Sequence, residues 1–409
     1  MIIEKISIGG FANIKGGSFA LSDINALVAT NGYGKSNALK AICFGAEFIS
    51  TSPQGKMAMM QDDTFLPINK QNDHQDFTFQ IDGKVNMDSA EMMFCYGFSF
   101  SWNTQNLVSE TLKMKGTNKQ RYTTLITRSL SDSFLFMPSA GCRCNKNASC
   151  HGAELAVNRN DIFARLFYAS LIEEIGRLCI PRLETMENPD YYFSTNRKQT
   201  LAFFDNKSAN EYIFWLMNNQ PHHYSIFKDG VMQILDNLES FEPYEAKVGE
   251  GLDSALYDIR IKDKYVTQQT SISRLSAGSK RIVFLFLISL TANIKGIPLI
   301  MLEEPENSVH PKLLENLVLL LNSYAEKTKL LFTSHSPYLA RHISTRKTYF
   351  GLPNKDGLAQ FAQIKEKKRK YLHQYASVME LTMGEFMFEF LLDIEDDMEK
   401  IEQFFDVQK

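Results

Sequence analysis

The chain has 409 residues, 44% of them hydrophobic and 22% charged, which is the composition of a folded globular protein and excludes a disordered one. Its 44 basic and 47 acidic side chains give a formal net charge of −3, which excludes a protein that coats nucleic acid through its whole surface but not a local basic patch. The length allows a large core and more than one structural unit.

The first residues and the apolar runs predict a cytoplasmic protein. Met1 to Ile8 alternate around acidic Glu4, which indicates a strand and not a signal peptide. The longest apolar run, from Ile282 to Ile294, contains polar residues and is too short to span a membrane. We therefore expect no membrane association, and we expect the six cysteines to be reduced thiols.

The N-terminal segment predicts strands followed by a helix. Residues 1 to 28 predict strands that meet at a turn around Gly16 and Gly17. An amphipathic helix is expected to begin at Asn37 and to end near Ser50. A tight glycine-rich loop joins the last strand to this helix.

This loop carries Gly32, Gly34, Lys35 and Ser36 where a phosphate-binding P-loop needs them. Glycines let successive backbone N–H groups point into one cavity, Lys35 can reach the β- and γ-phosphates, and the Ser36 hydroxyl can ligate Mg²⁺. The helix N-terminus adds partial positive charge. Ala29 stands where the first glycine of the motif belongs, so we expect an ordinary backbone conformation there. The predicted phosphate-binding residues are Asn31, Gly32, Tyr33, Gly34, Lys35, Ser36 and Asn37.

A polar stretch and a β-hairpin are expected after the first helix. Thr51 to Gln75 is rich in polar residues and proline and predicts a loop. Residues 76–81 and 91–102 alternate with period two, and Asp82-Gly83 offers a hairpin turn between them. Three aromatic residues of the second segment fall on one face and are expected in the core: Phe98, Phe100 and Trp102.

Helical spacing of apolar residues in 160–183 and 208–218 predicts a mainly helical insertion over residues 131–265. The insertion would separate an N-terminal part, residues 1–130, from a C-terminal part, residues 266–409. It shows no sustained heptads and is too short for a long coiled-coil arm.

A cluster of soft ligands lies in the predicted insertion, at Cys142, Cys144, Cys150 and His151. Cysteine and histidine are the ligands that zinc prefers, so a zinc site is one interpretation. The spacing is not that of a familiar zinc knuckle, which favours the other interpretation, a loop of reduced thiols.

The C-terminal part returns to alternating helices and strands. Helices are predicted over Ser279–Asn293 and Pro311–Lys327, and strands over Pro298–Leu302 and Leu330–Thr333. This alternation indicates a parallel sheet with helices on its faces.

Glu303 and Glu304 end the first of these strands, at the edge where open α/β sheets bind ligands. At a Walker B site the first carboxylate supports Mg²⁺ and the second orients or deprotonates the attacking water. Glu303 stands where aspartate is usual, and its longer side chain must still suit the tight octahedron of Mg²⁺. The alternative interpretation is a pair of solvated acids at an exposed strand end.

Two further motifs flank helices or strands of this part. Ser276, Ala277 and Gly278 precede a long apolar helix, and small residues at a helix N-terminus can form an anion site, or simply an N-cap. His335 follows the second strand, where an imidazole can hydrogen-bond a γ-phosphate, although a lone histidine is more often structural. The run Lys365 to Lys370 is typical of a solvated helix face and could also meet a phosphate backbone.

Taken in order, Asn31–Ser36, Leu275–Ser279, Leu302–Pro311 and Thr333–Pro337 resemble the motifs of ABC-type ATPases of the OLD-like (overcoming lysogenization defect) group. This group is kin to SMC and DNA-repair heads and includes ATPase subunits of bacterial anti-phage systems such as Septu and PARIS. The resemblance covers about residues 1–115 and 268–375. It implies a mixed α/β ATPase head with a β-hairpin subdomain, and ATP and Mg²⁺ as ligands.

The resemblance also implies roles for single residues and an assembly. The chain would act as a homodimer, or a higher even oligomer, in which the signature loop of one copy serves the nucleotide of the other. The family's Toprim nuclease acids are missing after His335, and its Q-loop glutamine cannot be assigned. The implied roles are phosphate and Mg²⁺ binding for Lys35 and Ser36, metal support for Glu303, water activation for Glu304, γ-phosphate sensing for His335, and action on the partner's nucleotide for Ser276 and Gly278.

The function that these motifs favour is an ATP-hydrolysing sensor or switch that controls a separate effector, such as a nuclease, in defence against phage. One alternative is an SMC-like DNA-maintenance head that clamps DNA. Another, of a different class, is a nucleotide-binding scaffold with negligible turnover, because Ala29 and Glu303 both depart from the usual motifs.

Overall fold

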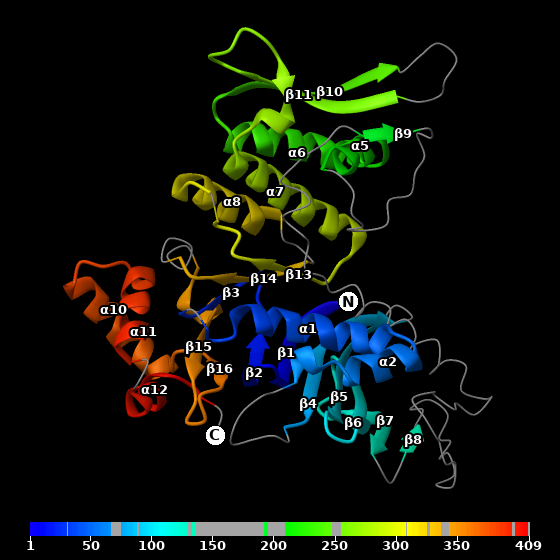
Figure 1. Ribbon diagram of the computed structural model, residues 1–409, viewed down its shortest axis with the longest axis vertical. Helices are drawn as coiled ribbons and strands as arrows, with labels where there is room; N and C mark the ends of the chain where they lie inside the picture. Colours follow the sequence, from blue (N-terminus) through cyan, green and yellow to red (C-terminus); the bar gives the residue numbers. More distant parts are fainter. Residues whose placement is uncertain are drawn as a thin grey trace. The chain divides into compact units, whose positions relative to one another are not determined.

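The computed structural model describes residues 1–30, 32–66, 75–87, 90–129, 133–135, 192–194, 209–247, 255–307, 309–324, 328–336, 343–394 and 397–407 (Figure 1). The chain divides into two compact units. The first contains Met1–Ile180, Ile297–Glu303 and Lys329–Lys409, and the second contains Pro181–Gly296 and Glu304–Thr328. One boundary therefore falls between the two adjacent glutamates, Glu303 and Glu304.

Four parallel strands form one end of the sheet in the first unit. They are rich in β-branched and other apolar residues and are almost fully buried, as expected for strands covered on both faces. The predicted parallel sheet is confirmed here. In spatial order these strands are β13 (Leu299–Glu303), β14 (Lys329–Ser334), β3 (Ile24–Val28) and β15 (Thr348–Pro353).

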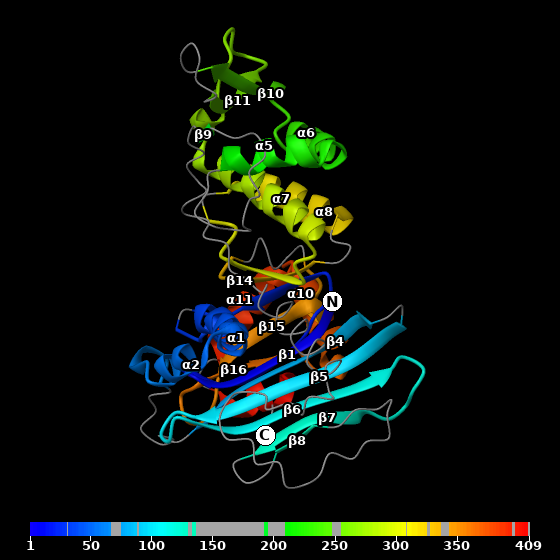
Figure 2. The ribbon, with the colours of Figure 1, turned by 90° about the vertical axis from the view of Figure 1, so that its right-hand side faces the viewer.

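The same sheet continues into a meander, and over the described residues it reaches 12 strands (Figure 2). The expected hairpin after the first helix is therefore confirmed and is extended by further antiparallel strands. The additional strands are β16 (Ala359–Ala362), β2 (Ile14–Ala20), β1 (Ile2–Phe11), β4 (Phe77–Met87), β5 (Ala90–Ser101), β6 (Asn106–Gly116), β7 (Thr123–Ser129) and β8 (Ser133–Leu135).

Three local predictions of turns and loops were wrong. Gly16 and Gly17 lie inside β2, and the chain turns instead at Ala12 and Asn13. Asp82 and Gly83 lie inside β4, where a Cβ on Gly83 would collide with the carbonyl oxygen of Ile2 on β1. The stretch 51–75 is not only loop. It contains α2 (Pro53–Met60), which Ser52 caps, and the short helix η1 (Asp63–Phe65).

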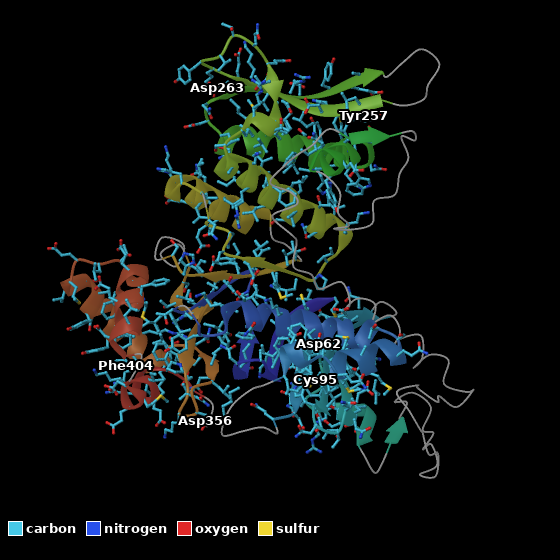
Figure 3. The ribbon with its side chains drawn as sticks, viewed as in Figure 1. Asp62, Cys95, Tyr257, Asp263, Asp356 and Phe404 are labelled. Atoms are coloured by element: carbon cyan, nitrogen blue, oxygen red, sulfur yellow. The ribbon has the colours of Figure 1, made fainter. Side chains whose placement is uncertain are left out.

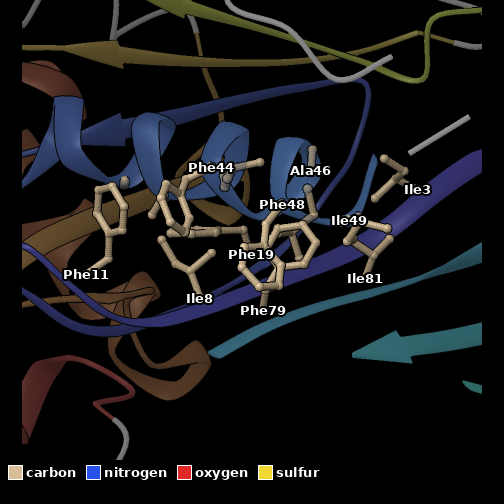
Figure 4. Close-up of a cluster of buried hydrophobic side chains, with 14 of the residues drawn as sticks. Ile3, Ile8, Phe11, Phe19, Phe44, Ala46, Phe48, Ile49, Phe79 and Ile81 are labelled. Carbon is tan, nitrogen blue, oxygen red and sulfur yellow. The ribbon is translucent and has the colours of Figure 1, made fainter. Parts of the chain in front are cut away.

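Helix α1 (Lys35–Ser50) packs on the sheet through an aromatic core (Figure 4). Phe44 and Phe48 of the helix meet the rings of Phe77 and Phe98, with centroids 5.1 and 5.0 Å apart respectively. Phe98, Phe100 and Trp102 are all buried, as predicted. This packing fixes the helix whose N-terminus follows the P-loop.

Three helices close the first unit beside β15 and β16 (Figure 1). Ile364, just before the first helix, forms an antiparallel β-bridge with Phe405, just after the last one. Phe405 also packs on Phe350 of β15, with ring centroids 5.5 Å apart. The helices are α10 (Glu366–Val378), α11 (Met383–Ile394) and α12 (Met398–Phe404), preceded by η3 (Thr345–Lys347).

The second unit combines helices with a small antiparallel sheet. The described residues of the predicted insertion, 131–265, contain strands as well as helices. The helical stretch predicted over 208–218 is confirmed by α5, and the one predicted over 160–183 lies outside the described residues. The elements are β9 (Tyr192–Ser194), α5 (Ala209–Asn219), α6 (Pro221–Ile234), β10 (Leu238–Lys247), β11 (Ala255–Asp263), β12 (Thr270–Ser271), η2 (Ile272–Arg274), α7 (Ala277–Lys295) and α8 (Pro311–Tyr324).

Helix α7 is the core helix of the second unit. By length and composition alone it could cross a membrane, but most of its side chains are buried against α5, α6 and α8. Phe286 of α7, for example, stacks on Phe227 of α6 with centroids 5.7 Å apart. Burial of this kind is what a core helix requires.

Gly45 of α1 tests this packing, because a Cβ at this position would overlap the ring of Phe79 on β4. Alanine should stabilise the helix by up to about 1 kcal/mol through its higher helix propensity. The forced shift of the Phe79 ring should destabilise the protein by about 1–3 kcal/mol. We expect Gly45→Ala to lower the urea midpoint of the protein. In a Phe79→Leu background the same substitution should be neutral or stabilising, and equal destabilisation in both backgrounds would contradict the packing described.

Candidate nucleotide-binding site

The loop between β3 and α1 has the backbone that a P-loop requires. Gly32 and Gly34 have φ of 89° and 74°, a left-handed region that glycine adopts without strain. Ala29 does not have a positive φ. This confirms the ordinary backbone conformation expected there. Asn31 lies outside the described residues. A Cβ on Gly32 would meet nothing within 4 Å, so this glycine is needed for conformation and not for space.

The methyl group of Ala29 is accommodated by a glycine on the neighbouring strand. A Cβ on Gly351 of β15 would lie 2.8 Å from the Ala29 Cβ and 2.8 Å from the Tyr33 carbonyl oxygen. Gly351 therefore leaves room for the alanine that replaces the first P-loop glycine. The residue that compensates for this departure from the motif is therefore close to Ala29 in space but far from it in the sequence.

Lys35 folds back over its own loop. Its Nζ donates to the carbonyl oxygens of Ala29 at 2.7 Å and Thr30 at 3.2 Å, and only 8% of the residue is exposed. A buried ammonium needs such acceptors because desolvation of the charge is costly. The contacts hold the positive charge at the loop, next to the N-terminus of α1.

Asn13 braces the loop and was missed by the sequence analysis. Its Nδ2 donates to the Gly32 carbonyl oxygen at 2.8 Å, and its Oδ1 accepts from Asn37 Nδ2 at 2.8 Å. One side chain from the β1–β2 turn thus joins the P-loop to the first turn of α1. The only local signal was an asparagine at a strand end, a residue type typical of turns.

The parallel register brings Glu303 to the same sheet edge as the P-loop. Glu303 pairs with Thr333 of β14, and Thr333 pairs with Leu27 of β3, two residues before Ala29. With neighbouring strands about 4.8 Å apart, the backbone of Glu303 lies roughly 10 Å from that of Leu27. The sequence prediction that these groups share one edge is confirmed for Glu303.

His335 follows β14 directly and is exposed at this edge. The preceding residue, Ser334, is fully buried and pairs with Val28 of β3. Its Oγ accepts from the Ser336 backbone N–H at 3.0 Å, a serine turn that fixes the backbone around the histidine.

The donor set at this edge fits Mg²⁺ carried by a nucleotide. Ser36 is exposed in the first turn of α1, a turn that lacks acidic residues, and Glu303 supplies one carboxylate. Within the described ranges no group of three His, Cys, Asp or Glu side chains could hold a metal ion unaided. Mg²⁺ commonly binds through one or two protein oxygens plus phosphates and waters, which is the set that these residues offer. The cysteine cluster at 142–151 lies outside the described residues.

In the second unit, Ser276 is the N-cap of α7. Its Oγ accepts from the Ser279 N–H at 3.1 Å, as the N-cap interpretation of the sequence predicted. Ser276 and Ala277 are exposed, and Gly278 is buried. An anion-binding role for these residues stays a prediction.

A buried carboxylate anchors the segment before this N-cap. Asp258 of β11 is fully buried, accepts from Ser271 Oγ at 2.8 Å and forms an ion pair with Arg260 at 3.0 Å. Ser271 in turn caps η2 by accepting from the Ser273 N–H at 3.2 Å. These bonds order the chain that leads into the motif.

Glu304 has a strained backbone and is held from both sides within the second unit. Its φ of 43° is uncommon for a residue with a side chain, and such strain concentrates at functional sites. Arg281 of α7 donates to its carbonyl oxygen at 3.0 Å, and Asn307 Nδ2 donates to its Oε2 at 2.9 Å. Neither partner was predicted from the sequence, although Arg281 is the last charged residue before the apolar run of α7.

Comparison with known proteins gives a partial family match. Residues 200–341 match the family model described as "AAA domain, putative AbiEii toxin, Type IV TA system". This range includes Ser276, Glu303, Glu304 and His335 but not the P-loop. No curated protein matches the chain.

Three solved structures are similar to the chain along most of its length. An SmcHead crystallised with the C-winged helix domain of ScpA has 13% identity and a TM-score of 0.51, covering 91% of this chain and 100% of that one. An SMC head domain from Thermotoga maritima has 14% identity and a TM-score of 0.45, with 89% and 100% covered. A Smc head with an extended coiled coil, bound to the C-terminal domain of ScpA and derived from Pyrococcus furiosus, has 10% identity and a TM-score of 0.45, with 92% and 99% covered.

The first of these likenesses shows that the chain has the fold of an SMC head, a mixed α/β fold as predicted. The partial match to an AAA domain indicates an ATPase-type nucleotide-binding protein.

The Asn13 brace should matter for nucleotide affinity. Asn13→Ala removes two hydrogen bonds, each typically worth about 0.5–1.5 kcal/mol, and should weaken ATP binding roughly three- to ten-fold by loosening the loop. Calorimetric titration of ATP measures this. Asn106→Ala is the control, because Asn106, at the start of β6, also donates its amide to a backbone carbonyl, that of Thr104, far from the P-loop in sequence. Equal affinities in both variants would contradict the bracing role.

Proposed function

We propose that the protein binds ATP with Mg²⁺ at the P-loop edge of its sheet and hydrolyses it to ADP and phosphate. The observation that carries the proposal is the arrangement in the first unit, where the P-loop, Glu303 and His335 follow the carboxyl ends of β3, β13 and β14. Ligands of open parallel sheets bind at this edge. The match to an AAA domain and the SMC-head fold support the same class of ligand.

The P-loop would bind the triphosphate. The left-handed backbone of Gly32 and Gly34 would let N–H groups of the loop face the phosphates, and α1 would add its positive N-terminal end. Lys35 would exchange its carbonyl acceptors for phosphate oxygens. Mg²⁺, held by the phosphates with Ser36 and Glu303, would offset charge on the transferred group. Asn37 and Tyr33 complete the segment that faces the ligand in this proposal.

Glu304 and His335 would act on the attacking water and on the γ-phosphate. In this proposal Glu304 is the general base, and Asn307 orients its carboxylate. Arg281 joins the Glu304 backbone to α7, the helix that begins at the Ser276 motif.

Hydrolysis would take place in a homodimer or a higher even oligomer. The Ser276–Gly278 motif and the P-loop would compete for one nucleotide if both served it within a single chain. We propose that each motif serves the nucleotide of the partner copy. ATP would then hold two copies together until it is hydrolysed, which gives the protein the behaviour of a switch.

We further propose that this switch controls a separate effector protein, such as a nuclease, in cytoplasmic defence against phage. This part of the proposal comes from the resemblance of the motifs to OLD-like ATPases. A second candidate, a nucleotide-binding scaffold with negligible turnover, is favoured by Glu303, which stands where aspartate is usual at a Walker B site. The rate of phosphate release separates the two.

Lys35→Ala tests nucleotide binding. Loss of a charge-assisted contact to the phosphates should lower ATP affinity roughly ten- to a hundred-fold. Lys40→Ala is the control, because Lys40 is an exposed lysine of the same helix. Calorimetry with ATP and Mg²⁺ is the measurement, and unchanged affinity in Lys35→Ala would remove the basis of the proposal.

Glu304→Gln tests catalysis and assembly together. The glutamine keeps an oxygen for Asn307 but cannot take a proton, so hydrolysis should fall by about 10²- to 10⁴-fold while ATP still binds. Light scattering should show ATP-dependent association of this variant, and adding Ser276→Arg should abolish it without loss of ATP binding. If ATP changes neither association nor the closure of an existing oligomer, the partner-site mechanism is wrong.

A further inference from the structure

The outward face of α10 carries basic and aromatic side chains that the proposed ATPase function does not use. Lys367, Lys370, Tyr371, Gln374 and Tyr375 follow the spacing of a single helix face, and all five are exposed. The tyrosines expose 53% and 49% of their surface. The opposite face is anchored in the first unit by Leu372 and Ala376, which are almost fully buried.

Two pairs of aromatic rings on and beside this helix are nearly parallel, whereas Tyr375 packs against Phe386 of α11 at an angle of 65°. Tyr371 and Tyr375 have ring centroids 6.2 Å apart and an interplanar angle of 17°. Tyr371 and Phe404 of α12 are 6.3 Å apart at 28°, and Figure 3 shows Phe404 among the side chains of the C-terminal helices. Because the supporting helix is packed on the unit, the two tyrosines lie side by side on its outward face and form a platform there.

The charge on this helix is positive although the whole chain is acidic. Its single acidic residue, Glu366, is engaged by Arg369 and by Arg346, the latter at 2.7 Å. Within the described part of the chain, Lys367 and Lys370 make no ion pair. Two uncompensated lysines therefore stand one turn apart beside the tyrosine platform.

We propose that this face of α10 binds single-stranded nucleic acid, with Lys367 and Lys370 on backbone phosphates and bases stacked on Tyr371 and Tyr375. Positive charge combined with exposed aromatic faces is the combination that single strands require. A duplex hides its base faces, and an acidic polypeptide would use the lysines but not the ring planes. Gln374, between the tyrosines, offers an amide to a base edge or a sugar.

The test measures binding of a fluorescent oligothymidylate to the full chain by anisotropy across a salt series. Binding is expected, with unlabelled single strands competing far better than duplex DNA or polyglutamate. Lys367→Glu/Lys370→Glu should make the salt dependence shallower by about 1.4 in log–log slope, because about 0.7 is lost per phosphate contact with single strands. Lys367→Arg/Lys370→Arg should restore the slope.

Tyr371→Ala/Tyr375→Ala should weaken binding at least about ten-fold at unchanged salt slope, since stacking does not release counterions. Matched controls are Tyr265→Ala, which removes a tyrosine that is 89% exposed, and Lys312→Glu, an exposed lysine of α8; both should bind like the wild type. Unchanged thermal unfolding excludes a folding defect. Absence of binding, equal competition by duplex or polyglutamate, or equal losses in the controls would each overturn the proposal, whatever the outcome for ATP.

Discussion

The parallel register of β13, β14 and β3 is the constraint on which the candidate site depends. It places Glu303, Thr333 and Leu27 in one row across the sheet. The P-loop, the Glu303 carboxylate and His335 therefore lie at the same edge. A slip of one residue in either pairing would move each side chain to the other buried face of the sheet, against the wrong packing partners, and would misplace these groups together. The buried apolar strands therefore set both the stability of the sheet and the geometry of the site.

The P-loop shows how a departure from a motif is absorbed elsewhere in the fold. Ala29 keeps an ordinary backbone conformation, and Gly351 on β15 leaves room for its methyl group. Asn13 then supplies a brace from the β1–β2 turn, and Lys35 holds its charge over the loop through two carbonyl oxygens. These contacts brace the described residues of the loop, and a braced loop costs less to organise when a ligand binds.

The sequence predicted the elements that carry a local pattern. Apolar runs identified β13 and β14, helical periodicity identified α1 and α7, and the glycine spacing identified the P-loop. Interactions between distant segments left no such pattern: Gly351 faces Ala29, Asn13 bonds Gly32, and Arg281 bonds Glu304. Gly83 misled the analysis for the same reason, because this glycine makes room for a carbonyl of β1 and does not form a turn. Helix α2 was missed because its signal is the Ser52 cap and Pro53, which resemble loop residues in a polar stretch.

The central claim is that a nucleotide occupies the edge defined by this register. A structure determined with Mg²⁺ and a non-hydrolysable ATP analogue tests it most directly. The account predicts phosphates over the N-terminus of α1, with Lys35 on the phosphates and Ser36 and Glu303 beside the metal ion. Triphosphate density at any other place in the fold, or a P-loop that stays empty at saturating analogue, would contradict it.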